Sequence, residues 1–396
     1  MLVPEGSTKE RIKQIQDTEA DVVVLNYEAM LYLKEFLLSR RWGFVILDES
    51  TAVGNFSADR TRYVALPLSK TTSLRRIMTG TPNPNDPALQ LFSQFEFLVP
   101  GVFGGNYYRF KDRYCILGGF NRKEVIGYKH LDELYAVIER YSSQVPDTVL
   151  GLPERVYNDV DAVLSGPTLK AYEEMRDELR TWWDGTEVKA RLAITQLLRL
   201  AQIAGGTLQE GDFKHWIPDN PKIKVLDEEL EEALRKPKSK AVVFAVYQEE
   251  IEQITNRYPQ YQPRAIYGKV TKTVSDKAWQ DFQKEGDPGR LMISQIHSGG
   301  ISIDLYAART AIYYTRNFSL EDYIQSQKRL HRMGQTGTVR IRHIMARLPM
   351  RGKKRPKSID EVMAKALDRK QRLSAGVMKG KFTKNEIVDL VNEALE

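Results

Sequence analysis

The sequence predicts an α/β protein with two lobes built on parallel sheets, a helical insertion between them and a basic C-terminal tail. Short β-branched runs alternate with longer amphipathic patterns, as strands and helices do in parallel sheets. This alternation is interrupted between about residues 156 and 220, where helical patterns dominate. We therefore expect a first lobe at 1–155, a helical connecting segment at 156–220, a second lobe at 221–348 and a basic tail at 349–396.

The composition excludes several other classes of protein. With 396 residues, 42% hydrophobic and 10% aromatic, the chain can bury the cores of two or three domains and is not wholly disordered. Its longest apolar runs, such as Val22–Leu25 and Ala241–Val246, are too short to cross a membrane. One Cys and five His argue against a disulfide framework and a structural zinc site. We expect a reducing compartment: the cytoplasm of a bacterial or virus-infected cell, or a nucleus.

Three strands are expected in the first lobe, and polar or small residues follow each one. The strands are Asp21–Leu25, Phe44–Leu47 and Arg76–Met78. The residues that follow them are Asn26-Tyr27-Glu28, Asp48-Glu49-Ser50-Thr51 and Thr79-Gly80-Thr81-Pro82. Because ligands of open parallel sheets bind beyond the carboxyl ends of the strands, these three clusters predict one crevice.

The acidic pair is the first candidate for chemistry. Four apolar residues, Phe44–Leu47, place Asp48 and Glu49 at the end of a strand that we expect to be buried. Two uncompensated carboxylates there would be costly to desolvate, and a divalent cation removes that cost. Asp48 would then hold Mg²⁺, and Glu49 would orient or deprotonate an attacking water. A solvated strand end with two acids is the alternative.

The second lobe repeats the alternation of strands and helices. Its expected strands are Ala241–Val246, Arg264–Tyr267, Leu291–Ser294, Ala311–Tyr314 and Val339–His343, with helices at Gln248–Tyr258 and Ser319–Met333. Arg329 and Arg332 are three residues apart, which places them on one face of the last helix, and Gly334 ends that helix as a C-cap would. Two guanidiniums on one face suit phosphate oxygens.

Positive charge is concentrated in the tail. Residues 346–396 hold 13 Lys or Arg against 7 Asp or Glu, which is +6 of the +7 net charge. The tightest basic cluster consists of Arg351, Lys353, Lys354, Arg355 and Lys357. A solvated linker would have this composition, and so would a segment that contacts nucleic-acid phosphates. We expect Lys353, Lys354 and Arg355 to contact DNA phosphates.

These motifs, in this order, resemble those of the Swi/Snf-type branch of the superfamily 2 helicase-like ATPases. Asp48–Thr51 resembles the Walker B box, Thr79–Pro82 the third helicase motif, and Asn26–Glu28 an upstream segment of the branch. Leu152-Pro153 resembles the element that closes the first lobe. Ser298–Leu305 and Gln325–Gln335 resemble the fifth and sixth motifs, and the sixth includes the His-Arg-x-Gly-Gln signature.

The resemblance implies two RecA-like lobes that close over ATP and Mg²⁺ while holding duplex DNA. It assigns Mg²⁺ to Asp48, water activation to Glu49, and the role of arginine fingers to Arg329 and Arg332. The other implied roles are nucleotide contacts for Gly300, Asp304 and Gln325, coupling for Thr79, Gly80 and Thr81, and DNA contacts for Asn26 and Tyr27. Such motors translocate along duplex DNA, most without separating its strands.

The phosphate loop of that family, G-x-x-x-x-G-K-[ST], is absent from the sequence. Gly268-Lys269 lacks its spacing, and Val270 replaces its hydroxyl residue. Three explanations are open: the chain is the C-terminal part of a longer ATPase, a separate polypeptide supplies the loop, or the chain is an inactive DNA-binding relic. We expect the first, since strands without their neighbours would bare apolar edges. A DNA-binding module without chemistry and a nuclease using Asp48 and Glu49 are the rival functions.

Overall fold

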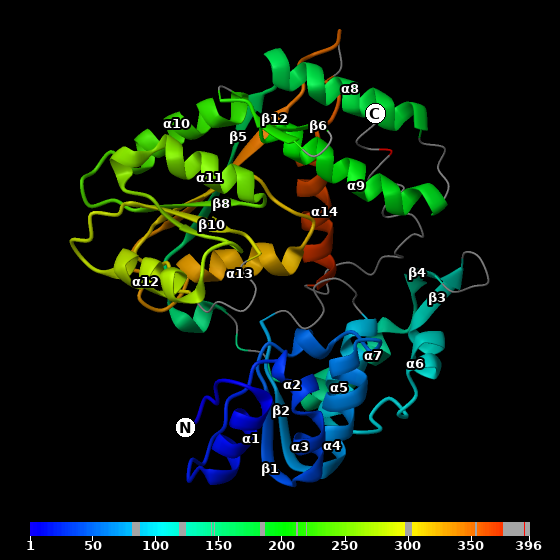
Figure 1. Cartoon of the computed structure of the whole chain (residues 1–396). Helices are drawn as coiled ribbons and strands as arrows, with labels where there is room; N and C mark the ends of the chain where they lie inside the picture. Colours follow the sequence, from blue (N-terminus) through cyan, green and yellow to red (C-terminus); the bar gives the residue numbers. More distant parts are fainter. Residues whose placement is uncertain are drawn as a thin grey trace. The chain divides into compact units, whose positions relative to one another are not determined.

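A computed structural model describes residues 1–80, 88–118, 124–143, 145, 147–182, 187–210, 213–218, 220–297, 303–352, 355–374 and 392. The chain divides into two compact units, one of Met1–Ser143 with Lys370–Lys384 and the other of Gln144–Arg369 with Asn385–Glu396 (Figure 1). No helix among these residues combines the length and the apolar character that a membrane span requires. The predicted domain limits at 155, 220 and 348 stay predictions.

A six-stranded sheet forms the centre of the second unit. Its order is β5-β12-β11-β8-β10-β9, and every neighbouring pair is parallel. The strands are β5 (Arg155–Val163), β8 (Ala241–Ala245), β9 (Arg264–Ile266), β10 (Leu291–Gln295), β11 (Thr310–Tyr313) and β12 (Val339–Arg347). The α/β fold class and the five predicted strands of this lobe are confirmed.

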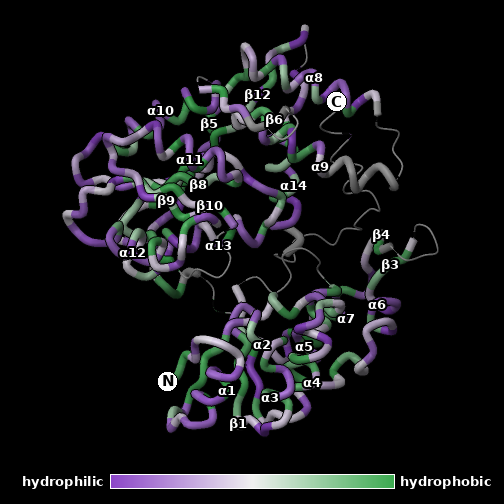
Figure 2. Tube along the Cα trace, viewed as in Figure 1, coloured by the Kyte–Doolittle hydropathy of each residue, from purple (hydrophilic) through white to green (hydrophobic). Residues whose placement is uncertain are grey.

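Helices cover both faces of this sheet (Figure 1). They are α10 (Pro221–Ala233), α11 (Gln248–Arg257), α12 (Lys272–Gln283) and α13 (Leu320–Leu330), with a 3₁₀ turn, η5 (Pro259–Tyr261). Strand β8 shows why both faces are covered: Val242 and Phe244 point into one apolar core, and Val243 points into another. The run is therefore continuously hydrophobic, as parallel strands buried on both sides are (Figure 2).

Strand β5 is an edge strand that the sequence analysis did not predict. It pairs with β12 along its whole length, from Arg155 opposite Val339 to Val163 opposite Arg347. The helical segment begins after it, with α8 (Gly166–Trp182) and α9 (Glu187–Ala204), and a hairpin of β6 (Thr207–Glu210) and β7 (Phe213–Trp216) follows. A 3₁₀ turn, η4 (Asp147–Leu150), precedes β5.

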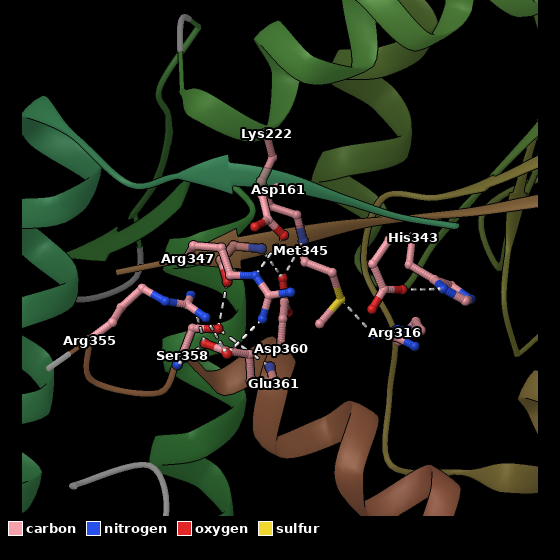
Figure 3. A network of polar contacts seen from close by, with 12 residues as sticks. Asp161, Lys222, Arg316, His343, Met345, Arg347, Arg355, Ser358, Asp360 and Glu361 are labelled. Carbon is pink, nitrogen blue, oxygen red and sulfur yellow. Dashed lines mark hydrogen bonds and ion pairs between the residues drawn. The ribbon is translucent and has the colours of Figure 1, made fainter. Parts of the chain in front are cut away.

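The predicted basic tail contains a docked helix, α14 (Ile359–Ser374). Its apolar side is buried against α8, α9 and the end of β12. Lys222 and Asp360, both buried, form an ion pair of 2.8 Å, and Arg347 joins Asp161 (2.7 Å) to Glu361 (2.6 Å), as Figure 3 shows. The described part of the tail up to Arg369 is therefore a structural element of the second unit.

The first unit has a smaller parallel sheet, in which β1 (Trp42–Leu47) pairs with β2 (Thr72–Ile77). An antiparallel hairpin joins β3 (Cys115–Gly118) to β4 (Glu124–Tyr128). The helices are α1 (Thr8–Asp17), α2 (Ala29–Tyr32), α3 (Lys34–Ser39), α4 (Leu66–Thr71), α5 (Leu89–Leu98), α6 (Tyr107–Tyr114) and α7 (Leu131–Tyr141), with a 3₁₀ turn η1 (Ser50–Val53) and a π-helical turn η2 (Thr61–Ala65).

The β1–β2 sheet is covered on one face and open on the other. Leu47 is buried in the core that α2 and α3 also line, and Val45 packs against that core. On the opposite face, Phe44, Ile46 and Leu74 are 50%, 48% and 64% exposed. Phe44 lies opposite Leu74 in the register, so these side chains form one apolar patch. We call Phe44, Ile46 and Leu74 the open face of the first unit.

The predicted strand at Asp21–Leu25 is wrong. The structure has only an isolated bridge between Val23 and Leu2, held by Leu2 N–H to the Val22 carbonyl (2.8 Å) and Val24 N–H to the Leu2 carbonyl (2.9 Å). Val22 and Val24 are exposed. The β-branched run has strand propensity, but within the described residues no longer segment pairs with it, and propensity alone does not make a strand.

A buried acid in the second unit predicts a specific dependence of stability on pH. Glu250 accepts hydrogen bonds from the Thr315 hydroxyl (2.6 Å) and the Tyr247 N–H (3.3 Å). Burial raises the pKa of Glu250 from 4.5 to about 8, although the hydrogen bond from Thr315 and the charge of Lys222 oppose this. Between these values the folded state retains a proton that the unfolded chain has lost, so the free energy of unfolding falls as pH rises.

We expect Glu250→Gln to remove this decline, because the amide keeps the shape of the acid without its titration. The measurement is the Tm of the second unit between pH 5 and pH 9. Glu252→Gln is the matched control, since Glu252 lies on the same helix and forms an exposed pair with Lys269. Parallel Tm profiles for wild type and Glu250→Gln would contradict the assignment.

Candidate functional site

The acidic pair of the first unit lies at the carboxyl end of β1, where backbone bonds to β2 fix the turn. Met78 N–H donates to the Leu47 carbonyl (2.9 Å) and Ser50 N–H donates to the Met78 carbonyl (2.9 Å), on either side of Asp48 and Glu49. Both acids are exposed. The predicted desolvation cost therefore does not arise in this structure, because water reaches both carboxylates.

Glu49 has a left-handed backbone, with φ 48° and ψ 56°. A non-glycine residue in this region costs about 1–2 kcal/mol. The Glu49 N–H donates to Asp48 Oδ1 (3.1 Å). Thr79 Oγ1, just after the end of β2, lies 3.5 Å from Glu49 Oε2. The structure therefore brings together Asp48, Glu49 and Thr79, three of the predicted site residues.

Tyr27 also belongs to this cluster. Its hydroxyl donates to the Asp48 carbonyl oxygen (2.6 Å). Burial, with the nearby charges of Asp48 and Glu49, raises the pKa of Tyr27 well above its usual range, so the hydroxyl stays protonated and able to donate. The Asn26 side chain accepts a hydrogen bond from the Ala29 N–H (3.1 Å) at the start of α2. Gly80 follows Thr79 in an exposed bend, and Thr81 lies outside the described residues.

The sequence analysis missed a buried support of this turn. The Ser50 hydroxyl donates to Gln94 Oε1 (2.7 Å), and both residues are fully buried. Gln94 lies on α5, 44 residues further along the chain, so no local pattern connects the two. The contact fixes the residue directly after Glu49 to the helix that packs beneath it.

The site of the second unit joins two predicted motifs. Asp304 and Arg332 form a close, hydrogen-bonded ion pair, and the side chains of both are partly exposed. Leu305 N–H donates to the Arg329 carbonyl (2.8 Å), which ties the same segment to α13. Gly300 lies outside the described residues.

The predicted helical face of Arg329 and Arg332 is wrong, because α13 ends at Leu330 and Arg332 lies in the bend that follows. The Gln335 amide causes this exit by donating to the carbonyls of Leu330 (3.3 Å), Tyr306 (3.1 Å) and Ala308 (2.9 Å). Gly334 is therefore not the cap of the helix.

Gly334 serves the turn that follows the helix instead. Its φ is +101°, and a Cβ there would lie 3.2 Å from the Tyr306 ring. His331 has a structural role as well, since its Nε2 lies 2.7 Å from the Pro153 carbonyl oxygen and donates to it. In the His-Arg-x-Gly-Gln signature, His331, Gly334 and Gln335 thus shape the loop and Arg332 remains for other contacts.

Arg329 and Gln325 lie on α13 and are half-buried. Burial lowers the pKa of Arg329. The hydroxyl of Tyr313 and the carboxylate of Asp322 partly oppose this shift. An arginine starts so far above neutral pH that the guanidinium stays charged. It is therefore a partly desolvated cation, in which state a contact to an anion is stronger than in water.

The tail residues that we predicted to contact DNA either pair with an acidic residue or lie outside the described residues. Arg355 pairs with Glu361 (2.9 Å) and Arg351 with Glu173 (2.6 Å). Lys353 and Lys354 lie outside the described residues. Among the described residues, no group of three or more His, Cys, Asp or Glu lies close enough together to hold a metal ion.

Comparison with known proteins assigns the chain to a class and a family. Residues 221–334 match the family described as Helicase conserved C-terminal domain, so the second unit is helicase-like. Residues 2–204, more than half of the chain, match the family described as SNF2-related domain. The chain belongs to the SNF2-related family.

Three relatives illustrate its range. The chain is 25% identical to "Putative protein p41" of Acyrthosiphon pisum secondary endosymbiont phage 1, over 99% of this chain and 81% of that protein. It is 25% identical to a Caenorhabditis elegans homologue of a SWI/SNF-related, matrix-associated regulator of chromatin, over 87% and 47%. It is 25% identical to a probable chromatin-remodeling complex ATPase chain of Oryza sativa, over 85% and 31%. The chain therefore spans less than half the length of the last two of these relatives.

Solved structures give weaker similarity. The Sulfolobus solfataricus SWI2/SNF2 ATPase core domain aligns at a TM-score of 0.48 and 21% identity, over 96% of this chain and 75% of that one. The same core in complex with dsDNA aligns at 0.45 and 20%, over 95% and 77%. The fold assignment therefore rests on the strand order and the family match.

Proposed function

We propose that the chain is part of a DNA-dependent ATPase that translocates along double-stranded DNA and hydrolyses ATP with Mg²⁺. The main support is the first-unit cluster: an acidic pair at the end of a parallel strand, with the Thr79 hydroxyl 3.5 Å from Glu49, in a chain of the SNF2-related family. The phage relative makes the cytoplasm of an infected bacterium the expected compartment.

Each site residue has a role that suits its chemistry. Glu49 would orient and deprotonate the attacking water, since its carboxylate is exposed at the strand end. Arg329 and Arg332 would stabilise charge on the γ-phosphate. Asp304 would hold Arg332 until the nucleotide replaces it as the partner, and Gln325 and Gly300 would add contacts to the nucleotide.

The donors present fit Mg²⁺ in its usual nucleotide-bound form. This ion needs only one or two protein carboxylates when phosphates and waters complete its shell. Asp48 offers an exposed carboxylate at the strand end, so Asp48 would hold the ion. When bound, Mg²⁺ would neutralise charge on the phosphates.

The first-unit cluster also suggests how nucleotide state reaches DNA. Thr79, with Gly80 and Thr81 beside it, would sense the position of the Glu49 carboxylate. The Tyr27 hydroxyl donates to the Asp48 carbonyl and so links this strand end to Tyr27 and to its chain neighbour, Asn26. Tyr27 and Asn26 would both face duplex DNA. Lys353, Lys354 and Arg355 would add phosphate contacts, with Arg355 exchanging Glu361 for a phosphate.

The phosphate loop that this function needs is absent from the 396 residues. The open face of the first unit supports a specific source for it. Parallel sheets are normally covered on both faces, yet Phe44, Ile46 and Leu74 are about half exposed or more. We propose that additional polypeptide, from a longer form of this protein or from a separate chain, covers this face and supplies the loop.

One alternative function is favoured by the same absence. A chain without a phosphate loop could bind duplex DNA and perform no chemistry. The two functions differ in one respect that is simple to measure, because only the first produces DNA-stimulated phosphate release that depends on Glu49.

We expect the chain alone to hydrolyse little or no ATP and to gain DNA-stimulated turnover when a phosphate-loop polypeptide is added. Glu49→Gln should then reduce turnover by about 10²–10⁴-fold, since it removes the base and keeps the shape. Glu35→Gln, an exposed acid on α3, is the control. Glu49-dependent turnover by the chain alone would refute the need for the loop, and DNA binding without turnover in every mixture would favour the binding module.

A further inference from the structure

Helix α13 is attached to the central sheet by polar contacts to three different strands. Side-chain hydrogen bonds join Tyr323 to His343 of β12 (2.8 Å), Ser326 to Tyr313 of β11 (2.7 Å) and Gln327 to Tyr157 of β5 (2.8 Å). Apolar contacts tolerate small sliding movements, whereas hydrogen bonds fail when donor and acceptor shift by about 1 Å. These three contacts therefore fix the register of α13 against the sheet.

The contact through His343 continues to the edge of the sheet. His343 is buried, its Nε2 lies 2.8 Å from the Tyr323 hydroxyl, and its Nδ1 lies 2.9 Å from Asp159 Oδ1 on β5. Asp159 lies directly opposite His343 in the strand register, and its side chain is 51% exposed. A chain of two hydrogen bonds thus runs from α13 across β12 to a carboxylate at the surface.

The charges around His343 give this chain one direction. The hydrogen bond from His343 holds the pKa of Asp159 below its usual range, so Asp159 is an ionised acceptor. Burial, helped by the Arg316 guanidinium and opposed by Asp159, lowers the pKa of His343, so the ring is neutral. Nδ1 must then donate to Asp159, and Nε2 accepts from the Tyr323 hydroxyl. Figure 3 shows His343, from the middle of β12, and Arg316 near each other.

The same helix holds predicted nucleotide contacts. Gln325 lies between Tyr323 and Ser326, and Arg329 lies two residues beyond Gln327. A slip of one residue along α13 would move these side chains by about 1.5 Å and turn them by about 100°. Misplacement of about 1 Å can reduce catalysis by about 100-fold.

We infer that Asp159, His343 and Tyr323 form a positioning relay that sets the orientation of α13 and, with it, of Arg329. The inference rests on the proposed function, in which Arg329 contacts the nucleotide. None of the three residues touches the nucleotide. Asp159 is the useful member for a test, because its truncation at the surface leaves no buried cavity.

The test compares two acids of the same strand by hydrogen exchange, read by mass spectrometry on the full chain. Asp159→Ala should speed amide exchange in α13 by about tenfold and leave α14 unchanged. Asp161→Ala is the matched control: Asp161 has a similarly exposed side chain (56%) and pairs with Arg347, which also contacts Glu361 of α14. Asp161→Ala should therefore affect α14 and spare α13.

A second pair of variants covers the buried end of the relay. Tyr323→Phe should speed exchange in α13, whereas Tyr314→Phe should not, because the buried Tyr314 hydroxyl donates to the Gly205 carbonyl (2.6 Å) and not to α13. In a preparation that hydrolyses ATP, Asp159→Ala should lower kcat about tenfold with KM for ATP within about twofold. Asp161→Ala should leave kcat within about twofold.

The outcomes separate the relay from the proposed function. Equal exchange in α13 for Asp159→Ala and Asp161→Ala, or a kcat that Asp159→Ala does not change, would overturn the relay. Full turnover by Arg329→Ala would instead overturn the proposed role of Arg329, whatever the exchange result.

Discussion

Replacing Arg329 with Ala is expected to abolish ATP turnover in a preparation that hydrolyses ATP and to leave duplex-DNA affinity nearly unchanged. Where an arginine completes a phosphoryl-transfer site, its loss lowers turnover by about 10³–10⁵-fold. Arg329 suits this role because it is a partly desolvated cation on a helix that three side-chain hydrogen bonds attach to the sheet. DNA affinity depends mainly on phosphate contacts of other residues.

The measurement is steady-state ATP hydrolysis with saturating DNA, together with DNA binding at a stated salt concentration. Arg340→Ala is the control, since Arg340 is an exposed arginine of β12 in the same unit. Retained turnover would show that Arg329 is not a finger. A parallel loss of turnover and DNA affinity would indicate misfolding, and the circular dichroism of the variant would then show it.

The second large effect concerns stability. Asp360→Ala should lower the free energy of unfolding of the second unit by about 3–5 kcal/mol, because it leaves the buried Lys222 ammonium without its partner. The side chain of Lys222 is 0% exposed and that of Asp360 8%, and the ion pair is 2.8 Å long. Asp360 Oδ2 also accepts the Ala346 N–H (2.8 Å), so the change frees a second buried donor.

Urea unfolding of the second-unit transition at pH 7 measures this cost. The control is Asp177→Ala, which breaks an exposed pair with Arg180 and should cost about 0–1 kcal/mol. The double change Lys222→Met with Asp360→Leu should recover much of the loss, since no unpaired charge remains. If Asp360→Ala cost no more than Asp177→Ala, the ion pair would not anchor α14.

The second lobe was predictable because its central strands β8, β10 and β11 are buried on both faces. A run such as Ala241–Ala245 is apolar at every position, and such a run between amphipathic segments has few other interpretations. Strand β5 escaped prediction because it is an edge strand with Asn158, Asp159 and Asp161, and only pairing with β12 makes it a strand. The run at Asp21–Leu25 failed for the converse reason: it is apolar, but among the described residues it forms only an isolated bridge and joins no sheet.

The candidate site was predictable as residue types and not as geometry. Helix α14 did have a local signal that the basic residues obscured: Ile359, Val362, Met363, Ala366 and Leu367 recur at helical spacing and are all buried. The end of α13 depends in part on distant contacts, because two of the three carbonyls that accept from the Gln335 amide lie nearly 30 residues away. The Asp304–Arg332 pair and the Ser50–Gln94 contact also depend on tertiary structure alone.

Photo-crosslinking tests most directly whether the acidic pair and the arginines share one nucleotide. The probe is ATP with a photoreactive group on its γ-phosphate, bound to the protein with duplex DNA and analysed by peptide mass spectrometry. We expect labelling of both the peptide that contains Asp48 and Glu49 and the peptide that contains α13, each suppressed equally by unlabelled ATP. Labelling confined to one unit, or unaffected by ATP, would contradict a shared site.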